Sequence, residues 1–360
     1  MPHTRLGQGL KRNGGFTLVE LLIVILIIAV LVSILIPTVS KVRTAAWVAN
    51  TKNQISQIEG ACQRYYGDQH QYPGPLDNAA LYTQERGHTA PQIYDANGGA
   101  VIPRADHITQ AENLVLGLFG GLKWTISGSA FKLCFDPDQI GRGMIGMNPA
   151  SPSNKKYAPY LDDVKMLSPA GKQYQDNSGQ ADDSGIPEIL DKFPSGMPIL
   201  YFRAHPGTKG VARFDMPESA VPAPRQYDMS DVYAYTRTNT LPGVGDVSIG
   251  EGKKISLKDY VTGVTFGSGY KGPTQTMRPH GLQDAIQPNN QPCSIIKGQP
   301  GYTFPYDGFA YLRDPSTPLD AVDNLNNTPR RKDTFILISP GADRVYGTSD
   351  DICNFGDVLP

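Results

Sequence analysis

Three carboxylates lie close together near the C-terminus, in a stretch whose glycines permit tight turns. They are Asp343, Asp350 and Asp351, with Gly341 and Gly347 beside them. Calcium takes about six to eight oxygen ligands from carboxylates, carbonyls and waters, so a short loop of this kind suits it. The spacing is not that of an EF-hand, which needs acidic residues at alternate positions and a glutamate at the end. The pattern predicts calcium binding, with an ordinary acidic surface turn as the alternative.

A fourth carboxylate, Glu20, stands at the start of a strongly apolar stretch. Between Leu21 and Ile36 no residue is charged, and Ser33 is the only polar one. A charge at the centre of a bilayer costs roughly 2.5–3.5 kcal/mol on insertion scales, and less near the interface. A carboxylate at this position therefore predicts a partner for Glu20 in the membrane.

The four cysteines have no spacing typical of a metal site. They are Cys62, Cys134, Cys293 and Cys353, and none of them forms a Cys-x-x-Cys pair, which argues against zinc. In an oxidising compartment an even number of cysteines permits two disulfides, with three possible pairings. Free buried thiols are the alternative, and the sequence does not choose between them.

The remaining residues favour neither catalysis nor nucleic-acid binding. The chain has 33 basic and 34 acidic residues, a net charge of −1, and no basic stripe. It contains no nucleophile elbow, phosphate loop or dinucleotide fingerprint. No two histidines have the spacing of metal ligands on a helix; they are His3, His70, His88, His107, His205 and His280. The sequence therefore predicts a protein that is not an enzyme.

The element that must position Glu20 is an apolar helix over residues 16–37. At 1.5 Å per residue it spans roughly 30 Å, the thickness of a bilayer core. Basic residues precede it, namely Arg5, Lys11 and Arg12. By the positive-inside rule the N-terminus stays in the cytoplasm and the rest of the chain is exported.

Residues 15–20, Gly-Phe-Thr-Leu-Val-Glu, resemble the leader junction of type IV pilins and type II secretion pseudopilins. In that family a prepilin peptidase cuts after the glycine, here Gly15, and methylates the new N-terminal residue, here Phe16. The resemblance implies that Glu20 pairs with the amino group of Phe16 in a neighbouring subunit during filament assembly. Pro37 also falls at a frequent proline site of the family. The alternatives are an ordinary secretory signal and a permanent single-pass anchor.

The helical pattern continues in the more polar residues 38–67. Pro37 is predicted to kink the helix because it lacks an N–H group, and Gly67 is predicted to end it. Apolar residues recur at steps of three and four on the face that we expect to be buried: Ile55, Ile58, Cys62 and Tyr65.

Further along the chain the sequence predicts one helix and several strands. Thr109 and Glu112 form a capping-box pattern ahead of a helix that Gly120-Gly121 ends. The predicted strands are Phe131–Phe135, Pro198–Arg203, Val232–Thr236, Tyr260–Phe266, Phe309–Leu312 and Thr334–Ser339. The last is the most apolar, as expected for a buried central strand.

The acidic loop after that strand resembles the calcium-binding C-terminal loop of major pseudopilins. The resemblance implies that Asp343, Asp350 and Asp351 are calcium ligands. Two residues depart from the family pattern. Arg344 puts a positive charge beside the proposed ion where a glycine is common, and Cys353 stands among usually polar residues.

Together these features predict a pilin-like α+β fold, with a long N-terminal helix packed on an antiparallel β-sheet and a large irregular insertion. The resemblance covers only residues 13–73 and 333–356. The predicted parts are a cleaved leader at 1–15, a transmembrane half-helix at 16–37, an exported half-helix at 38–67, a head with the insertion at 68–330, and a C-terminal strand with the acidic loop at 331–360.

The resemblance implies a pseudopilin subunit that forms a filament in a type II secretion or type IV pilus-like system. Its partners would be copies of itself, prepilin peptidase, the assembly platform of the inner membrane and the membrane itself, without nucleic acid. We expect a single pass through the inner membrane and a periplasmic or extracellular head. The alternatives are a minor pilin with an adhesive head and a membrane-anchored exported enzyme.

Overall fold

The computed structural model contains one long helix, one shorter helix and several antiparallel β-sheets. The described residues are 18–76, 93–94, 108–148, 150–168, 186–194, 196–205, 207–211, 226–227, 233–236, 253–256, 312–317, 327–342 and 350–356. The chain divides into two compact units, an N-terminal unit at Met1–Trp47 and a C-terminal unit at Val48–Pro360. Helices and antiparallel strands are both present, so the predicted α+β class is confirmed.

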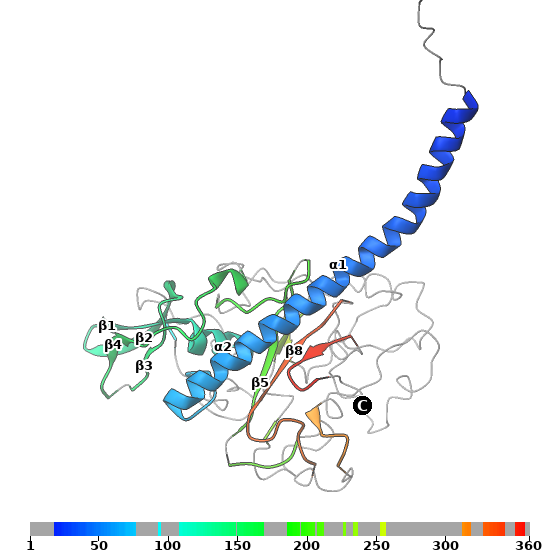
Figure 1. The fold of residues 1–360 in the computed structure, drawn as a ribbon. Helices are drawn as coiled ribbons and strands as arrows, with labels where there is room; N and C mark the ends of the chain where they lie inside the picture. The colour runs from blue at the N-terminus through cyan, green and yellow to red at the C-terminus, as the bar shows by residue number, and fades with distance from the viewer. Residues whose placement is uncertain are drawn as a thin grey trace, which may run out of the picture. The chain divides into compact units, whose positions relative to one another are not determined.

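Helix α1 spans Leu18–Gln69 and continues through Pro37 (Figure 1). Its apolar part has a mean hydropathy of 3.3 and no buried residue, and by length and composition it could cross a membrane. The prediction that Gly67 ends the helix is wrong, because the backbone stays helical through Gly67. The helix ends after Gln69, where His70 takes a left-handed φ of 55°. The kink at Pro37 stays a prediction.

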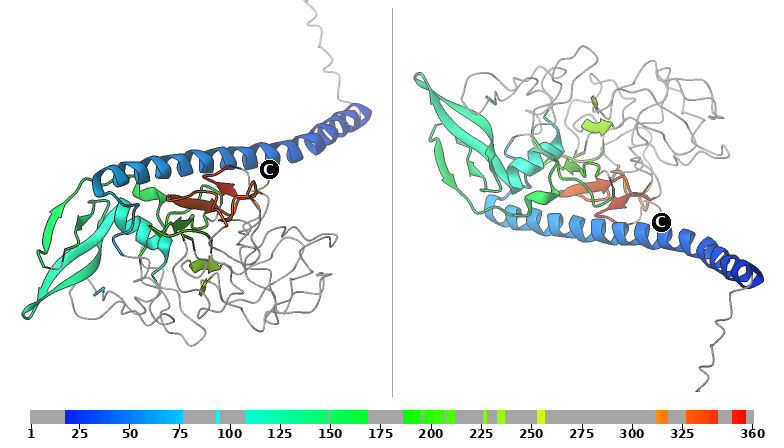
Figure 2. Two further views of the ribbon diagram at one scale, coloured as in Figure 1. Left: turned by 90° about the horizontal axis from the view of Figure 1, so that it is seen from below. Right: turned by 90° about the horizontal axis from the view of Figure 1, so that it is seen from above.

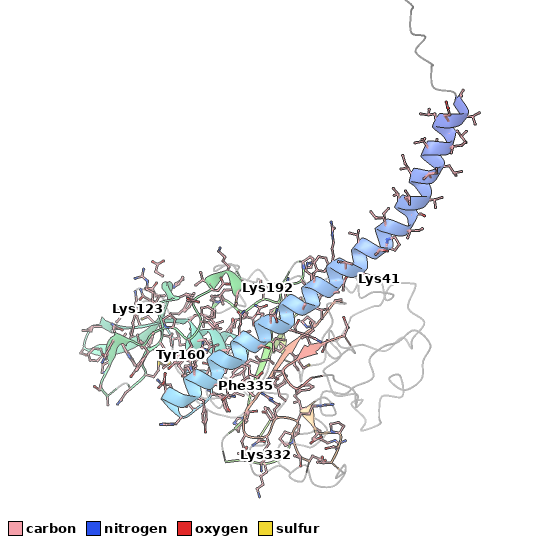
Figure 3. The ribbon with its side chains drawn as sticks, viewed as in Figure 1. Lys41, Lys123, Tyr160, Lys192, Lys332 and Phe335 are labelled. Carbon is pink, nitrogen blue, oxygen red and sulfur yellow. The ribbon has the colours of Figure 1, made fainter. Side chains whose placement is uncertain are left out.

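The last part of α1 belongs to the C-terminal unit and buries one face. Tyr65 donates a hydrogen bond from Oη to Met144 Sδ at 3.3 Å, and its ring lies 5.1 Å from that of Tyr160. Figure 3 shows Tyr160 and Phe335 beside this part of the helix. The predicted apolar face is confirmed, since its residues are all at most 3% exposed: Ile55, Ile58, Cys62 and Tyr65.

Helix α2, Gln110–Leu118, has the capping box that the sequence predicts. The Thr109 side chain accepts a hydrogen bond from the Glu112 N–H at 3.0 Å, and the Glu112 carboxylate accepts one from the Thr109 N–H at 2.7 Å. Each bond satisfies an N–H group that has no partner within the helix. Gly120 and Gly121, with φ of 90° and 121°, turn the chain out of α2.

Four strands follow α2, of which the sequence predicted only part of one. β1 (Gly120–Ser127) pairs antiparallel with β2 (Ala130–Ile140), and β3 (Ile145–Gly146) with β4 (Ser153–Lys156). The predicted strand Phe131–Phe135 is confirmed inside the longer β2. A single-turn helix, η3, follows at Val164–Met166.

The central sheet has three strands in the order β5–β8–β9, which lie side by side in both views of Figure 2. They are β5 (Leu200–Arg203), β8 (Phe335–Ser339) and β9 (Ile352–Cys353), and both pairings are antiparallel. Every residue of β8 is buried, which confirms the predicted buried central strand. Hydrophobic burial of this strand contributes to stability in proportion to the apolar area removed from water.

A separate pair of strands joins β6 (Tyr233–Thr236) and β7 (Lys253–Ser256). β6 confirms a predicted strand, whereas β7 was not predicted. The predicted strand Tyr260–Phe266 lies outside the described residues. So does Phe309–Leu312, except for Leu312, which is buried in the core next to β8 and is not in a strand.

The turn after α1 contacts both long strands of the central sheet. The ring of Tyr72 lies 5.0 Å from that of Phe335 in β8. The carbonyl of Pro73 accepts a hydrogen bond from Tyr201 Oη in β5 at 2.9 Å. These contacts fix the chain where it leaves α1.

Replacing Gly117 in α2 with alanine is expected to destabilise the protein, although alanine usually stabilises a helix by about 1 kcal/mol over glycine. A Cβ at this position would lie 2.8 Å from the backbone nitrogen of Gly74 and 3.1 Å from Pro73 Cβ. Because backbone must move, we expect a loss of about 1–3 kcal/mol in the free energy of unfolding. Urea denaturation measures it.

The matched control is Gly60→Ala in α1, where the nearest atom to a Cβ is Arg64 Nη1 at 3.8 Å. This change is expected to be neutral or stabilising. Equal losses in both variants would contradict the close packing of the turn against α2.

Candidate functional site

The first candidate site is the beginning of α1. Gly15 and Phe16 lie outside the described residues, and the described helix begins at Leu18. Glu20 lies in the first turn, where the partial positive charge of a helix N-terminus favours a carboxylate. From Leu21 to Ile36 the large apolar side chains are exposed within this unit. The surface of this helix is therefore suited to lipid or to other apolar helices.

The few polar side chains within the apolar part of α1 bond to their own helix. Ser33 Oγ donates to the Val30 carbonyl at 2.7 Å, and Thr38 Oγ1 donates to the Ile34 carbonyl at 2.9 Å. Such bonds satisfy a hydroxyl where no water is present. Glu20 differs from these hydroxyls because it carries a charge, which is costly to place in hydrocarbon.

The second candidate site is the acidic loop between β8 and β9. Asp343 lies outside the described residues, but both ends of the loop are described. Asp350 Oδ2 accepts a hydrogen bond from the Ala342 N–H at 2.7 Å, and Asp351 is 7% exposed. Gly341 has a φ of 62°, and a Cβ there would lie 2.2 Å from the Asp350 carbonyl oxygen. Only glycine permits the two ends to approach this closely.

The base of the loop is anchored on the central sheet. Ser339 pairs with Ile352 and Ile338 pairs with Cys353 in the β8–β9 ladder. The partly buried Phe355 packs against the core beyond the loop. The loop therefore begins and ends on rigid, buried backbone.

The oxygens found at the two ends fit a hard cation such as calcium. Asp350 offers a carboxylate and a backbone carbonyl near Gly341, and Asp351 adds a second carboxylate. Within the described part of the chain, no three acidic, histidine or cysteine side chains form a metal-binding group. The predicted third ligand, Asp343, lies outside the described residues. Of the three predicted ligands, the structure therefore places only Asp350 and Asp351.

Three of the four disulfide candidates are described, and they carry free thiols. Cys62 and Cys134 are buried and Cys353 is partly buried, while Cys293 lies outside the described residues. Burial, and secondarily the charge of Glu59, raises the pKa of the Cys62 thiol well above its usual value. A protonated thiol is a poor nucleophile, so Cys62 is a packing residue of α1.

One ion pair in the C-terminal unit was not predicted from the sequence. Arg331 Nη2, just before β8, pairs with Glu59 Oε1 on α1. The two residues are 272 positions apart. Their separation leaves no local pattern by which the pair could have been found.

Comparison with known proteins gives two matches. The family model described as the prokaryotic N-terminal methylation motif matches residues 10–36, which include Gly15, Phe16 and Glu20. The Type II secretion system core protein G of Pectobacterium carotovorum subsp. carotovorum is 32% identical over 93 residues. That alignment covers 26% of this chain and 60% of the relative, less than two thirds of its length. No solved structure matches the chain.

Both matches agree with the structure. The methylation motif precedes and enters α1, whose apolar part is exposed along its length. The C-terminal unit contains the last part of α1, which is buried on one face, together with antiparallel strands. The motif, the similarity to a secretion core protein and the long apolar helix together make the chain similar to type IV pilins and pseudopilins.

Proposed function

We propose that this protein is a filament-forming pseudopilin subunit of a type II secretion or type IV pilus-like system. The observation that supports it most is the match of the methylation motif to the start of a helix whose apolar part has no buried residue. About 20 exposed apolar residues need either lipid or the helices of neighbouring subunits to cover them. A filament subunit uses both environments, first in the membrane and then in the filament.

The proposed partners follow from this role. Prepilin peptidase cuts between Gly15 and Phe16, and an inner-membrane assembly platform adds the mature subunit to other copies. The similarity to a type II secretion system core protein favours a secretion pseudopilin over a pilus subunit. We place the N-terminus in the cytoplasm because Arg5, Lys11 and Arg12 precede the helix. The head then lies in the periplasm or outside the cell.

We further propose that the loop between β8 and β9 binds calcium through Asp343, Asp350 and Asp351. The support is the close approach of the loop ends at Gly341 and the oxygens gathered there. When bound, the ion would neutralise the repulsion between adjacent carboxylates. The chain's own contribution is to hold the two ends of the loop together on the β8–β9 ladder.

Replacing Glu20 with leucine is expected to leave membrane insertion unchanged and to reduce filament yield at least tenfold. Leucine is more favourable in the membrane, but it cannot pair with the amino group of a neighbouring Phe16. Breaking one partner of a buried charge pair costs about 3–5 kcal/mol. Membrane fractionation measures insertion, and sedimentation of sheared filaments followed by immunoblotting measures assembly.

The control is Ser33→Leu in the same apolar part, because Ser33 bonds only to its own helix in the structure. This variant is expected to assemble as the wild type does. Equal filament yields from Glu20→Leu and the wild type would contradict the proposed pairing.

A further inference from the structure

A short segment of the C-terminal unit, Leu190–Lys192, is attached to α1 through buried side chains. The carbonyl of Leu190 accepts a hydrogen bond from Gln54 Nε2 at 2.8 Å. The N–H of Lys192 donates to Thr51 Oγ1 at 3.2 Å. Thr51 and Gln54 are at most 1% exposed, so these bonds are shielded from water and hold the segment against one turn of α1.

The residue between these two attachments is a buried carboxylate. Asp191 is 5% exposed, and its Oδ1 accepts hydrogen bonds from the N–H groups of Phe193 at 3.3 Å and Met197 at 3.1 Å. Its Oδ2 accepts one from Ser339 Oγ at 3.0 Å. Three donors stabilise a charge that would otherwise be costly to bury, and they also fix the position of the carboxylate.

Ser339 connects this carboxylate to the acidic loop. It is the last residue of β8, it pairs with Ile352 of β9, and it is fully buried. The loop begins at the next residue and closes where the Ala342 N–H meets Asp350. Asp191 therefore contacts the base of the loop with its side chain, while its two neighbours along the chain contact α1 with their backbones.

We propose that Asp191 is a positioning residue that couples the acidic loop to α1 at Thr51 and Gln54. Ser339 holds the Asp191 carboxylate, and the segment around Asp191 holds the helix turn at Thr51 and Gln54. A cation held by the loop then stiffens α1 at a distance from the ion. The part of this proposal that involves a cation rests on the calcium site proposed above, whereas the coupling itself does not.

The test is hydrogen exchange of the full chain in detergent, read by mass spectrometry in two peptides, 340–353 and 48–58. In the wild type, calcium compared with chelator is expected to slow exchange in both peptides. In Ser339→Ala, calcium is expected to slow exchange in 340–353 only, because the contact with Asp191 is lost. Asp191→Asn is expected to speed exchange in both peptides about tenfold in chelator, equivalent to about 1.4 kcal/mol, the cost of a lost charged hydrogen bond.

Asp138→Asn is the control, because it removes an exposed carboxylate of β2 and is expected to change neither peptide. Calcium protection of 48–58 that persists in Ser339→Ala, or that is absent in a wild type whose loop is protected, overturns the coupling. If calcium protects neither peptide in the wild type, the calcium site fails and Asp191→Asn decides the coupling alone. Faster exchange in both peptides then supports it, and faster exchange in only one or in neither overturns it.

Discussion

Changing Gly15 to valine is expected to leave most of the protein as an uncleaved precursor, with residues 1–15 attached and Phe16 unmethylated. The motif match covers this junction, and the proposed cut falls directly after Gly15. A branched side chain at the cut obstructs a peptidase site that accepts a small residue. Without the cut, Phe16 has no free amino group to pair with Glu20, so filaments are expected to be absent as well.

Mass spectrometry of the N-terminal peptide measures this result directly, because cleavage and methylation each change its mass. Gly14→Val is the matched control, since it alters the adjacent glycine and leaves the proposed cut unchanged. Native protein that begins anywhere other than Phe16, or a Gly15→Val variant cut as efficiently as the wild type, would refute the processing assignment.

Removing calcium is expected to lower the melting temperature of the full chain in detergent by about 3–5 °C. A ligand that binds only the folded state adds RT ln(1 + [L]/Kd), about 2.7 kcal/mol at a hundredfold excess over Kd. At about 2.1 cal/mol/K of unfolding entropy per residue, 1 kcal/mol corresponds to about 1.3–1.5 °C for a chain of this size. Magnesium is expected to substitute poorly, because it demands octahedral geometry and releases its waters reluctantly.

The double variant Asp350→Ala with Asp351→Ala is expected to melt at the lower temperature with or without calcium. The matched control changes another adjacent acidic pair, Asp162 and Asp163, which is exposed. That control is expected to keep the full calcium shift. A protein first stripped of metal whose melting temperature is indifferent to calcium would leave the loop as an acidic turn.

The features that the sequence predicted correctly are those set by neighbouring residues. The capping box of Thr109 and Glu112 depends on a spacing of three residues, and the structure contains both of its hydrogen bonds. The run Phe335–Ile338 is apolar at every position, as a strand buried on both faces requires. The buried face of α1 follows from apolar residues that recur every three or four positions.

The features that were missed depend on local backbone conformation in some places and on distant contacts in others. β1 begins within the glycine pair that ends α2, so the pair was interpreted as a turn rather than as the start of a strand. Gly67 remains helical because nothing in its surroundings requires a positive φ, and His70 turns the chain instead. Asp191 and Ser339 lie 148 positions apart, and no local pattern relates a carboxylate in a loop to the end of a strand so far along the chain.

The place of β8 in the sheet determines the order in which the protein can fold. β8 is the central strand of its sheet, yet it lies near the end of the chain, after β5 and after the α1 face that packs beside it. Contacts between residues so far apart in sequence form slowly, because a long loop must close before they contribute. The ion pair of Glu59 with Arg331 and the ring contact of Tyr72 with Phe335 therefore form only once the chain as far as β8 is available. Folding of the C-terminal unit is then completed late, and its partly folded forms expose apolar surface that favours aggregation.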